Sequence, residues 1–288
     1  MRGVLISIAK ILGFLALWAA LLSAVVMTPV LLVGPDWFAD VRWRLFVEIG
    51  GAIGVLIALA VMGLLVDRRA VASLGFPADG RVADVLFGAA LGAAILMAPI
   101  GILVVLGAAR WAPDLAGFSG QALAIGLVLC LFNVVTQNAL VRSYIFQEMW
   151  AKYGAATAIV VTTILFVALH AGPISQGTQG LIAAANIMLA SVLLSLAYVR
   201  SGALWLPIGI HLGWNGLQGP VLGINVTGNE LALGEWRMFE FFGNPLFTGG
   251  EMGVEGGLIG LIGPALGIIA VTLLVKQRPK PDFARQSQ

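Results

Sequence analysis

Three pairs of polar or aromatic residues lie within apolar stretches of the chain, where such groups are unusual. The members of each pair are four residues apart: Asn138 with Arg142, Phe166 with His170, and His211 with Asn215. This spacing places both members on one face of an α-helix. Polar and ionisable groups are costly inside a membrane, so each of them needs a partner or a function. The pairs therefore predict a polar site within a membrane protein.

Further polar residues extend these faces, and simpler explanations exist for single positions. Asn133 and Gln137 form a polar arc beside the first pair, and Gln218 follows the third pair by about one turn. Either histidine alone could be a hydrogen-bonded contact between helices. Arg142 could instead extend its side chain to the membrane surface.

A zinc site built from His170, His211 and Asn215 is the metal-binding alternative. Catalytic zinc usually has three histidine or carboxylate ligands, and the chain contains no HExxH motif. The single cysteine, Cys130, excludes an intrachain disulfide and a site with several cysteine ligands. We therefore predict no metal and no cofactor.

The composition predicts that lipid covers most of the surface. Hydrophobic residues make up 60% of the chain and charged residues 10%, and the mean hydropathy is +1.00. A soluble protein carries about 25% charged residues. The basic residues form no cluster of the kind that binds nucleic acid. The predicted partners are the lipid bilayer and molecules embedded in it.

Apolar stretches separated by glycine, proline and charged residues predict an all-α bundle of about eight transmembrane helices. These helices cover residues 11–33, 45–66, 82–108, 122–150, 155–171, 181–199, 203–224 and 257–276. The first is too long for the apolar core of a cleaved signal, which has about 7–15 residues. The fourth is unusually polar and is expected to kink or to end early, with a turn to the fifth near Gly154. Gly88 with Gly92 permits close helix packing.

The distribution of lysine and arginine predicts the orientation, because cytoplasmic loops carry the excess of positive charge. One side of the eight-helix arrangement would hold Arg2, Lys10, Arg68, Arg69, Arg81, Lys152, Arg200, Lys276, Arg278, Lys280 and Arg285, and the other would hold Arg42, Arg44, Arg110 and Arg237. Both termini are therefore predicted to be cytoplasmic. The longest loop, 225–256, would face outward.

The three pairs resemble the motifs of a known family of membrane proteases. Residues 137–142 (QNALVR), 166–170 (FVALH) and 211–215 (HLGWN) are similar to the EExxxR, FxxxH and HxxxN/D motifs of the CPBP family. That family includes the CAAX prenyl endopeptidases and the bacterial bacteriocin-immunity type membrane proteases. The resemblance implies one membrane domain over 1–288 with a core at about 82–276, a bacterial inner membrane location, and hydrolysis of peptide bonds within the membrane. The implied catalytic residues are Gln137, Asn138, Arg142, Phe166, His170, His211 and Asn215.

The chain departs from the family at the position that matters most for hydrolysis. Gln137 and Asn138 stand where the family has two glutamates, the first of which is thought to activate water as a general base. In the family the histidines hold that water, and a histidine with the asparagine stabilises the oxyanion. A carboxamide has the shape of a carboxylate but does not act as a base. General acid–base catalysis contributes about 10²–10⁴ in rate, so we expect weakened or lost peptidase activity.

Two substitutes for the missing base are open. One is a neutral imidazole, from His170 or His211. The other is a glutamate folding towards the site: Glu48, Glu148, Glu251 or Glu255. The alternative function is that of a pseudoprotease, which binds a membrane-embedded peptide or protein or stabilises a membrane protein complex. A transporter is a third possibility, which rests only on the buried polar residues.

Overall fold

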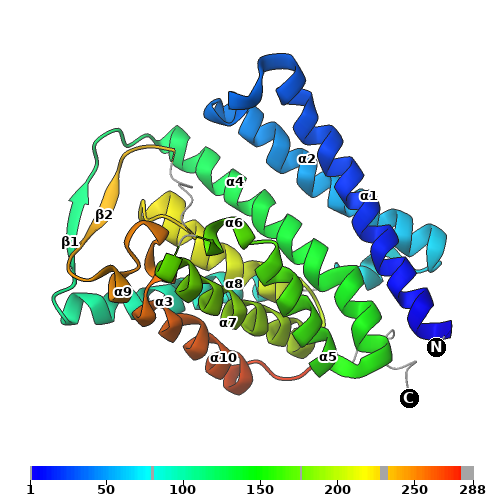
Figure 1. Cartoon of the computed structure of the whole chain (residues 1–288). Helices are drawn as coiled ribbons and strands as arrows, with labels where there is room; N and C mark the ends of the chain where they lie inside the picture. The colour runs from blue at the N-terminus through cyan, green and yellow to red at the C-terminus, as the bar shows by residue number, and fades with distance from the viewer. Residues whose placement is uncertain (1, 79–80, 176, 228–232, 280–288) are drawn as a thin grey trace.

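The computed structural model describes residues 2–78, 81–175, 177–227 and 233–279. It is an all-α bundle with one small sheet, which confirms the predicted fold class of a multi-pass membrane protein (Figure 1). Lys280 and Arg285, which belong to the predicted charge pattern, lie outside the described residues.

The helices follow the predicted order. The long ones are α1 (Arg2–Val33), α2 (Val41–Ala60), α3 (Val82–Val105), α4 (Gly120–Ala139), α5 (Phe146–Ala168), α7 (Gly177–Ser201), α8 (Trp205–Gly216) and α10 (Ile262–Leu274). The short ones are α6 (Ala171–Ile174) and α9 (Pro245–Thr248). Three π-helical segments, Val61–Val66, Leu140–Ile145 and Leu217–Val221, continue α2, α4 and α8.

By length and composition, 5 helical stretches among the described residues could each cross a membrane: Gly3–Val33, Val41–Val66, Val82–Val105, Gly120–Ala168 and Gly177–Ser201. The fourth stretch is broken at Gly154, whose φ of 85° and ψ of 164° are not helical. Its two arms are the predicted fourth and fifth helices, and the predicted turn is confirmed. The seventh and eighth predicted helices are shorter than expected. Pro220 lies within the π-helical end of α8, and Pro264 lies in the first turn of α10.

Backbone contact between α3 and α8 sets the position of the helix that carries His211 and Asn215. A Cβ atom added to Gly92 would collide with the carbonyl oxygen of Ile210, and one added to Gly213 would collide with that of Ala89. The close packing predicted from the α3 glycines is therefore a contact within the chain. Since neither helix has a side chain between the backbones, α8 has little freedom to shift.

The sequence did not predict the two-stranded sheet. β1 (Ala109–Asp114) pairs antiparallel with β2 (Arg237–Phe241), so the segment after α3 joins the long loop before α10, called the outer loop after its predicted orientation. Arg110 and Glu240 form an ion pair at 2.6 Å across the strands. The rings of Trp111 and Phe239 pack edge to face with centroids 5.1 Å apart. The sheet closes the end of the bundle beside α3 (Figure 1).

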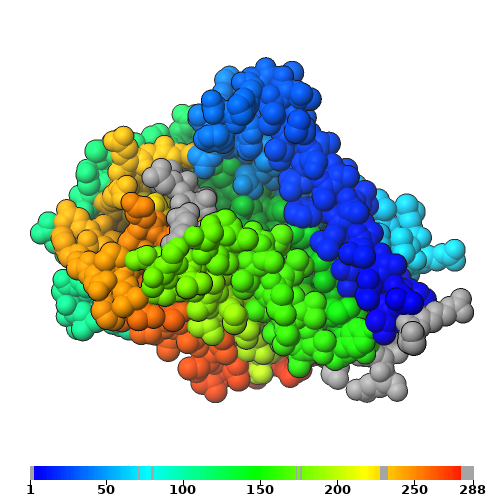
Figure 2. Space-filling model, viewed as in Figure 1, coloured from blue at the N-terminus to red at the C-terminus, as the bar shows by residue number. Residues whose placement is uncertain are grey.

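The α1–α2 hairpin lies against the bundle. Polar contacts hold it there at the end of the bundle opposite the sheet, which we call the fastened end. Lys10 of α1 forms an ion pair with Asp67 at 2.5 Å, and Ser7 donates a hydrogen bond to Glu148 of α5 at 2.9 Å. Lys152 donates to the backbone oxygen of Gly3 at 2.9 Å. The molecular surface is hollowed between this hairpin and the helices below it (Figure 2).

Candidate active site

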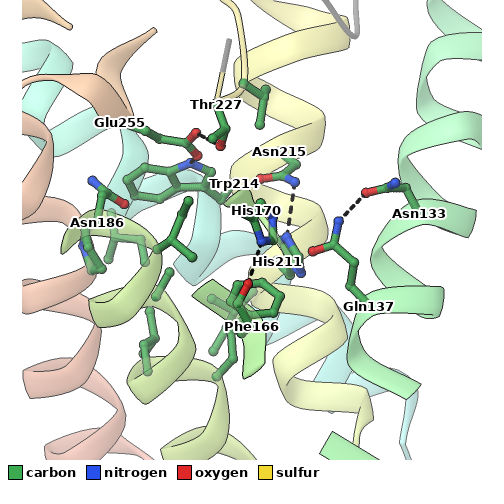
Figure 3. A pocket seen from close by; sticks show the side chains of 18 of the residues that line it. Asn133, Gln137, Phe166, His170, Asn186, His211, Trp214, Asn215, Thr227 and Glu255 are labelled. Atoms are coloured by element: carbon green, nitrogen blue, oxygen red, sulfur yellow. Dashed lines mark hydrogen bonds between the residues drawn. The ribbon is translucent and has the colours of Figure 1, made fainter. Parts of the chain in front are cut away.

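A central cavity of about 470 Å³ brings residues of the three motifs together. Its polar lining comes from four α-helices and three connecting segments: Arg44 and Glu48 (α2), Asn133 and Gln137 (α4), His170 (between α5 and α6), Asn186 (α7), His211 and Asn215 (α8), and Thr227 and Glu255. Phe166 and Trp214 also line it (Figure 3). Of the predicted site residues, Gln137, Phe166, His170, His211 and Asn215 reach the cavity, whereas Asn138 and Arg142 lie behind it.

Arg142 is completely buried, which rules out the extension to the membrane surface that its sequence position permitted. Its Nη2 donates to the Ser191 hydroxyl at 3.2 Å, and its Nη1 donates to Oδ1 of Asn138 at 3.5 Å. The guanidinium carbon lies 4.7 Å from the centre of the Phe166 ring, within the range of a cation–π interaction. All of these contacts are with neutral groups. Because glutamine and asparagine stand where the family motif has glutamates, the hydrogen-bond acceptors of Arg142 are neutral.

The Asn138 amide is held in one orientation. Its Oδ1 accepts from Arg142, which can only donate, and its Nδ2 donates to the Val134 backbone oxygen at 2.8 Å, which can only accept. The same Nδ2 lies 3.2 Å from Nδ1 of His211. Because a neutral imidazole has one donor and one acceptor nitrogen, Nδ1 of His211 is the acceptor. The ring proton is therefore on Nε2, and His211 is a hydrogen-bond donor on its Nε2 side.

Asn215 lies on that side of His211. Its Nδ2 is 3.1 Å from Nε2 of His211 (Figure 3), so two donors face each other without an acceptor. A half-turn of the Asn215 amide supplies one, since the oxygen and nitrogen of an amide exchange places. A ligand carbonyl oxygen placed beside the two groups, within hydrogen-bond distance of both, would also supply one. The pair therefore has the character of an oxyanion hole.

His170 has the opposite tautomer. Its Nδ1 lies 2.7 Å from the Phe166 backbone oxygen, which can only accept, so Nδ1 carries the proton. Nε2 of His170 is then the ring nitrogen with a free lone pair, on a residue that lines the cavity. The two histidines thus differ in chemistry: His211 donates a hydrogen bond, and His170 can accept a proton.

Gln137, at the position of the family base, is held by a neighbour on its own helix. Its Nε2 donates to Oδ1 of Asn133 at 2.6 Å, and its Oε1 is buried with no hydrogen-bond partner among the described residues. Asn133 in turn places its Nδ2 3.4 Å from each carboxylate oxygen of Glu48. A carboxylate is therefore connected to this position only through two amides.

The four glutamates considered as substitutes divide into two groups. Glu48 and Glu255 line the cavity. Glu148 lies instead beside Ser7 and Lys10, and Glu251 lines a separate outer cavity with Asn225 and Arg237. The structure thus excludes Glu148 and Glu251 as groups facing the site.

Glu255 lies in the loop before α10, and both of its oxygens have partners. Nε1 of Trp214 donates to Oε1 at 2.8 Å, and the Thr227 hydroxyl donates to Oε2 at 2.5 Å. Burial raises the pKa of this carboxyl above its ordinary value, although the two hydrogen bonds act in the opposite direction.

Comparison with known families identifies the segment that carries the motifs. Residues 119–217 match the family model described as type II CAAX prenyl endopeptidase Rce1-like. The chain carries an Rce1-like domain. This segment contains all three motif segments, in agreement with the resemblance to the CPBP family. No curated protein and no solved structure matches the chain.

The cavity of the Rce1-like domain contains residues that the motifs did not indicate, notably Asn186, Trp214 and Thr227. An asparagine within an apolar helix is a detectable signal, because it is costly there. Nothing in the sequence linked Thr227 to the motifs. Within the described ranges, no three side chains of the His, Cys, Asp or Glu types are grouped so as to hold a metal ion.

Proposed function

We propose that the protein binds a peptide segment of a membrane protein in the central cavity and cleaves it weakly or not at all. The observation that carries this proposal is the state of the base position. Gln137 donates to Asn133, and Asn138 lies between Arg142 and His211. Neither carboxamide accepts a proton from water, while the donors of the oxyanion hole persist beside them.

The cavity suits a peptide bond as a ligand. A backbone amide offers a carbonyl acceptor and an N–H donor. The carbonyl oxygen could lie beside Nε2 of His211 and Nδ2 of Asn215, which are 3.1 Å apart, and accept a hydrogen bond from both. The unpartnered Oε1 of Gln137 is an acceptor that an N–H group or a water molecule would satisfy. Binding would thus satisfy the Gln137 oxygen, which has no hydrogen-bond partner among the described residues.

The test uses the full chain in lipid nanodiscs with a library of hydrophobic peptides that carry a photoreactive group. We expect capture of a subset of peptides by the unmodified protein, and loss of capture in His211→Ala and Asn215→Ala. Mass spectrometry should detect little cleavage by the unmodified protein and much more by the double variant Gln137→Glu, Asn138→Glu. Rapid cleavage by the unmodified protein, at the rate of the double variant, would overturn the proposal.

Slow hydrolysis with His170 as the base is the second candidate. The hydrogen bond from Nδ1 of His170 to the Phe166 carbonyl leaves Nε2 free to take a proton from water. In that case His170→Gln would abolish any residual cleavage while peptide capture persists. Persistence of the residual cleavage in His170→Gln would exclude this mechanism.

We further propose a bacterial inner membrane location with both termini in the cytoplasm. The fastened end of the bundle, with Lys10, Arg69 and Lys152, carries the excess of basic residues, which favours the cytoplasmic side. Fusion of a reporter that is active only in the cytoplasm to either terminus should give signal, and fusion within 225–256 should not.

A further inference from the structure

The central cavity has an apolar part beside the polar one. Ile95, Leu193, Leu194 and Ile210 line it and belong to one core cluster together with Trp214. These side chains come from α3, α7 and α8. In Figure 3 the Trp214 indole lies between Glu255 and the two histidines. The indole thus lines the cavity together with these four apolar side chains, which form an apolar recess in its wall.

The position of the indole is set from two directions. On its polar edge, Nε1 donates to Glu255, which the Thr227 hydroxyl also holds. On its ring edge it lies against α10, because a Cβ atom added to Gly263 would lie 2.6 Å from two of its ring carbons. Trp214 is only 8% exposed, so its indole cannot adopt another orientation unless the neighbouring side chains also move.

The contacts of Glu255 make it a poor candidate for the missing base. Its described partners are two neutral donors, one on each oxygen, and the carboxyl is 7% exposed. A group that activates water must be within reach of that water, whereas here the indole lies between Glu255 and the histidines (Figure 3). The geometry is that of a residue that orients a neighbour.

We propose that Glu255 is a positioning residue that holds the Trp214 indole, and that the indole sets the size of the apolar side chain that the cavity accepts from a bound peptide. The inference rests on the proposed function, because it assigns a subsite for a peptide bound in the same cavity. The ligand of this subsite is an aliphatic or aromatic side chain next to the peptide bond held by His211 and Asn215.

The experiment measures side-chain preference, which a merely structural role of these residues would leave unchanged. A captured peptide is synthesised as a series from alanine to tryptophan at each position in turn, and binding to the protein in nanodiscs is measured. Trp214→Ala should move the preferred side chain at one position to a larger size. Gly263→Ala should push the indole into the recess and move the preference to a smaller size, with a loss of about 10-fold or more per excess methylene.

Two changes at Glu255 separate positioning from base catalysis. Glu255→Gln retains an acceptor for the indole N–H and should keep the original size preference, although it removes any base. Glu255→Leu removes the acceptor and should broaden the preference. Glu251→Gln, on an exposed residue that lines the outer cavity, is the matched control and should match the unmodified protein.

The outcomes distinguish this inference from the function on which it rests. If peptides bind through His211 and Asn215 but the size preference is the same in Trp214→Ala and Glu255→Leu, the subsite assignment is wrong and the proposed function stands. If the unmodified protein captures no peptide, or if capture persists in His211→Ala, both the subsite assignment and the proposed function are wrong. Should Gly263→Ala not fold, Trp214→Ala alone decides the assignment.

Discussion

Nδ2 of Asn138 lies 3.2 Å from Nδ1 of His211, and through this contact a residue behind the cavity determines which nitrogen of the imidazole carries the proton. Arg142 holds the amide oxygen on the far side, at 3.5 Å. A carboxylate at the same position would reverse the relationship, since it would accept a hydrogen from Nδ1. The replacement of a glutamate by asparagine thus alters the chemistry of a histidine as well as removing a base.

Asn138→Asp should therefore move the proton of His211 from Nε2 to Nδ1. The carboxylate would accept from Nδ1 and would pair with the Arg142 guanidinium. Nitrogen-15 NMR of histidine-labelled protein in lipid reports the tautomer directly. Asn133→Asp, five residues earlier in the same helix, is the control and should leave the His211 signals in place. Identical His211 tautomers in the unmodified protein and in Asn138→Asp would refute the assignment.

Arg142 should prove dispensable for folding but sensitive to the loss of its volume. Its charge is completely buried among neutral acceptors, and replacement of buried charges by apolar residues of similar size is often neutral or stabilising by about 1–4 kcal/mol. Arg142→Met should therefore unfold at the same or a higher denaturant concentration. Arg142→Ala leaves a cavity and should be less stable by about 2–5 kcal/mol. A strongly destabilised Arg142→Met would mean that the guanidinium contacts contribute net stability.

The glycines at the contact between α3 and α8 should not tolerate substitution by a residue with a side chain. Gly92→Ala places a methyl group against the Ile210 carbonyl oxygen, and such overpacking costs about 1–3 kcal/mol. Gly101→Ala in the same helix meets nothing within 4 Å and should be neutral or slightly stabilising, because alanine is the better helix former. Thermal unfolding in detergent compares the two variants. A shift of α8 in Gly92→Ala should also weaken peptide capture.

The stability of the protein should fall with rising pH because of Glu255. Burial raises the folded-state pKa of this carboxyl above the ordinary 4.5, so the folded state retains a proton that the unfolded state releases. The resulting stability is fully present below about 4.5 and is lost as pH rises through the folded-state pKa. Glu48, Arg44 and the two histidines line the same cavity, so the measurement is a difference between variants.

Glu255→Gln should remove this part of the pH dependence, whereas Glu251→Gln should keep it. Denaturant unfolding between about pH 4 and pH 8 supplies the comparison. The same slope in the unmodified protein and in Glu255→Gln would show that Glu255 titrates normally.

The sequence predicted which side chains lie together at the cavity better than it predicted the ends of the helices that carry them. A spacing of four residues is a local property of helices, so the pairs at 138/142, 166/170 and 211/215 could be recognised without a structure. The turn at Gly154 was also predictable from a local signal, because a glycine there separates two apolar stretches. The pairing of β1 with β2 was not, because it joins segments that are distant in the chain and have weak strand patterns. The roles of Trp214 and Glu255 depend on contact between α8 and the outer loop, which local spacing does not encode.

The cavity extends beyond the Rce1-like segment. Residues 119–217 supply the histidines and the amides, but Arg44 and Glu48 precede that segment, and Thr227 and Glu255 follow it. The walls that meet the rest of a bound chain therefore come from regions that the family model does not cover. Two homologues with the same motif helices could bind entirely different ligands, because the motif residues and the rest of the cavity wall lie in separate parts of the sequence. Exchange of the α1–α2 hairpin or the outer loop between homologues would then transfer selectivity while the chemistry stays with the motif helices.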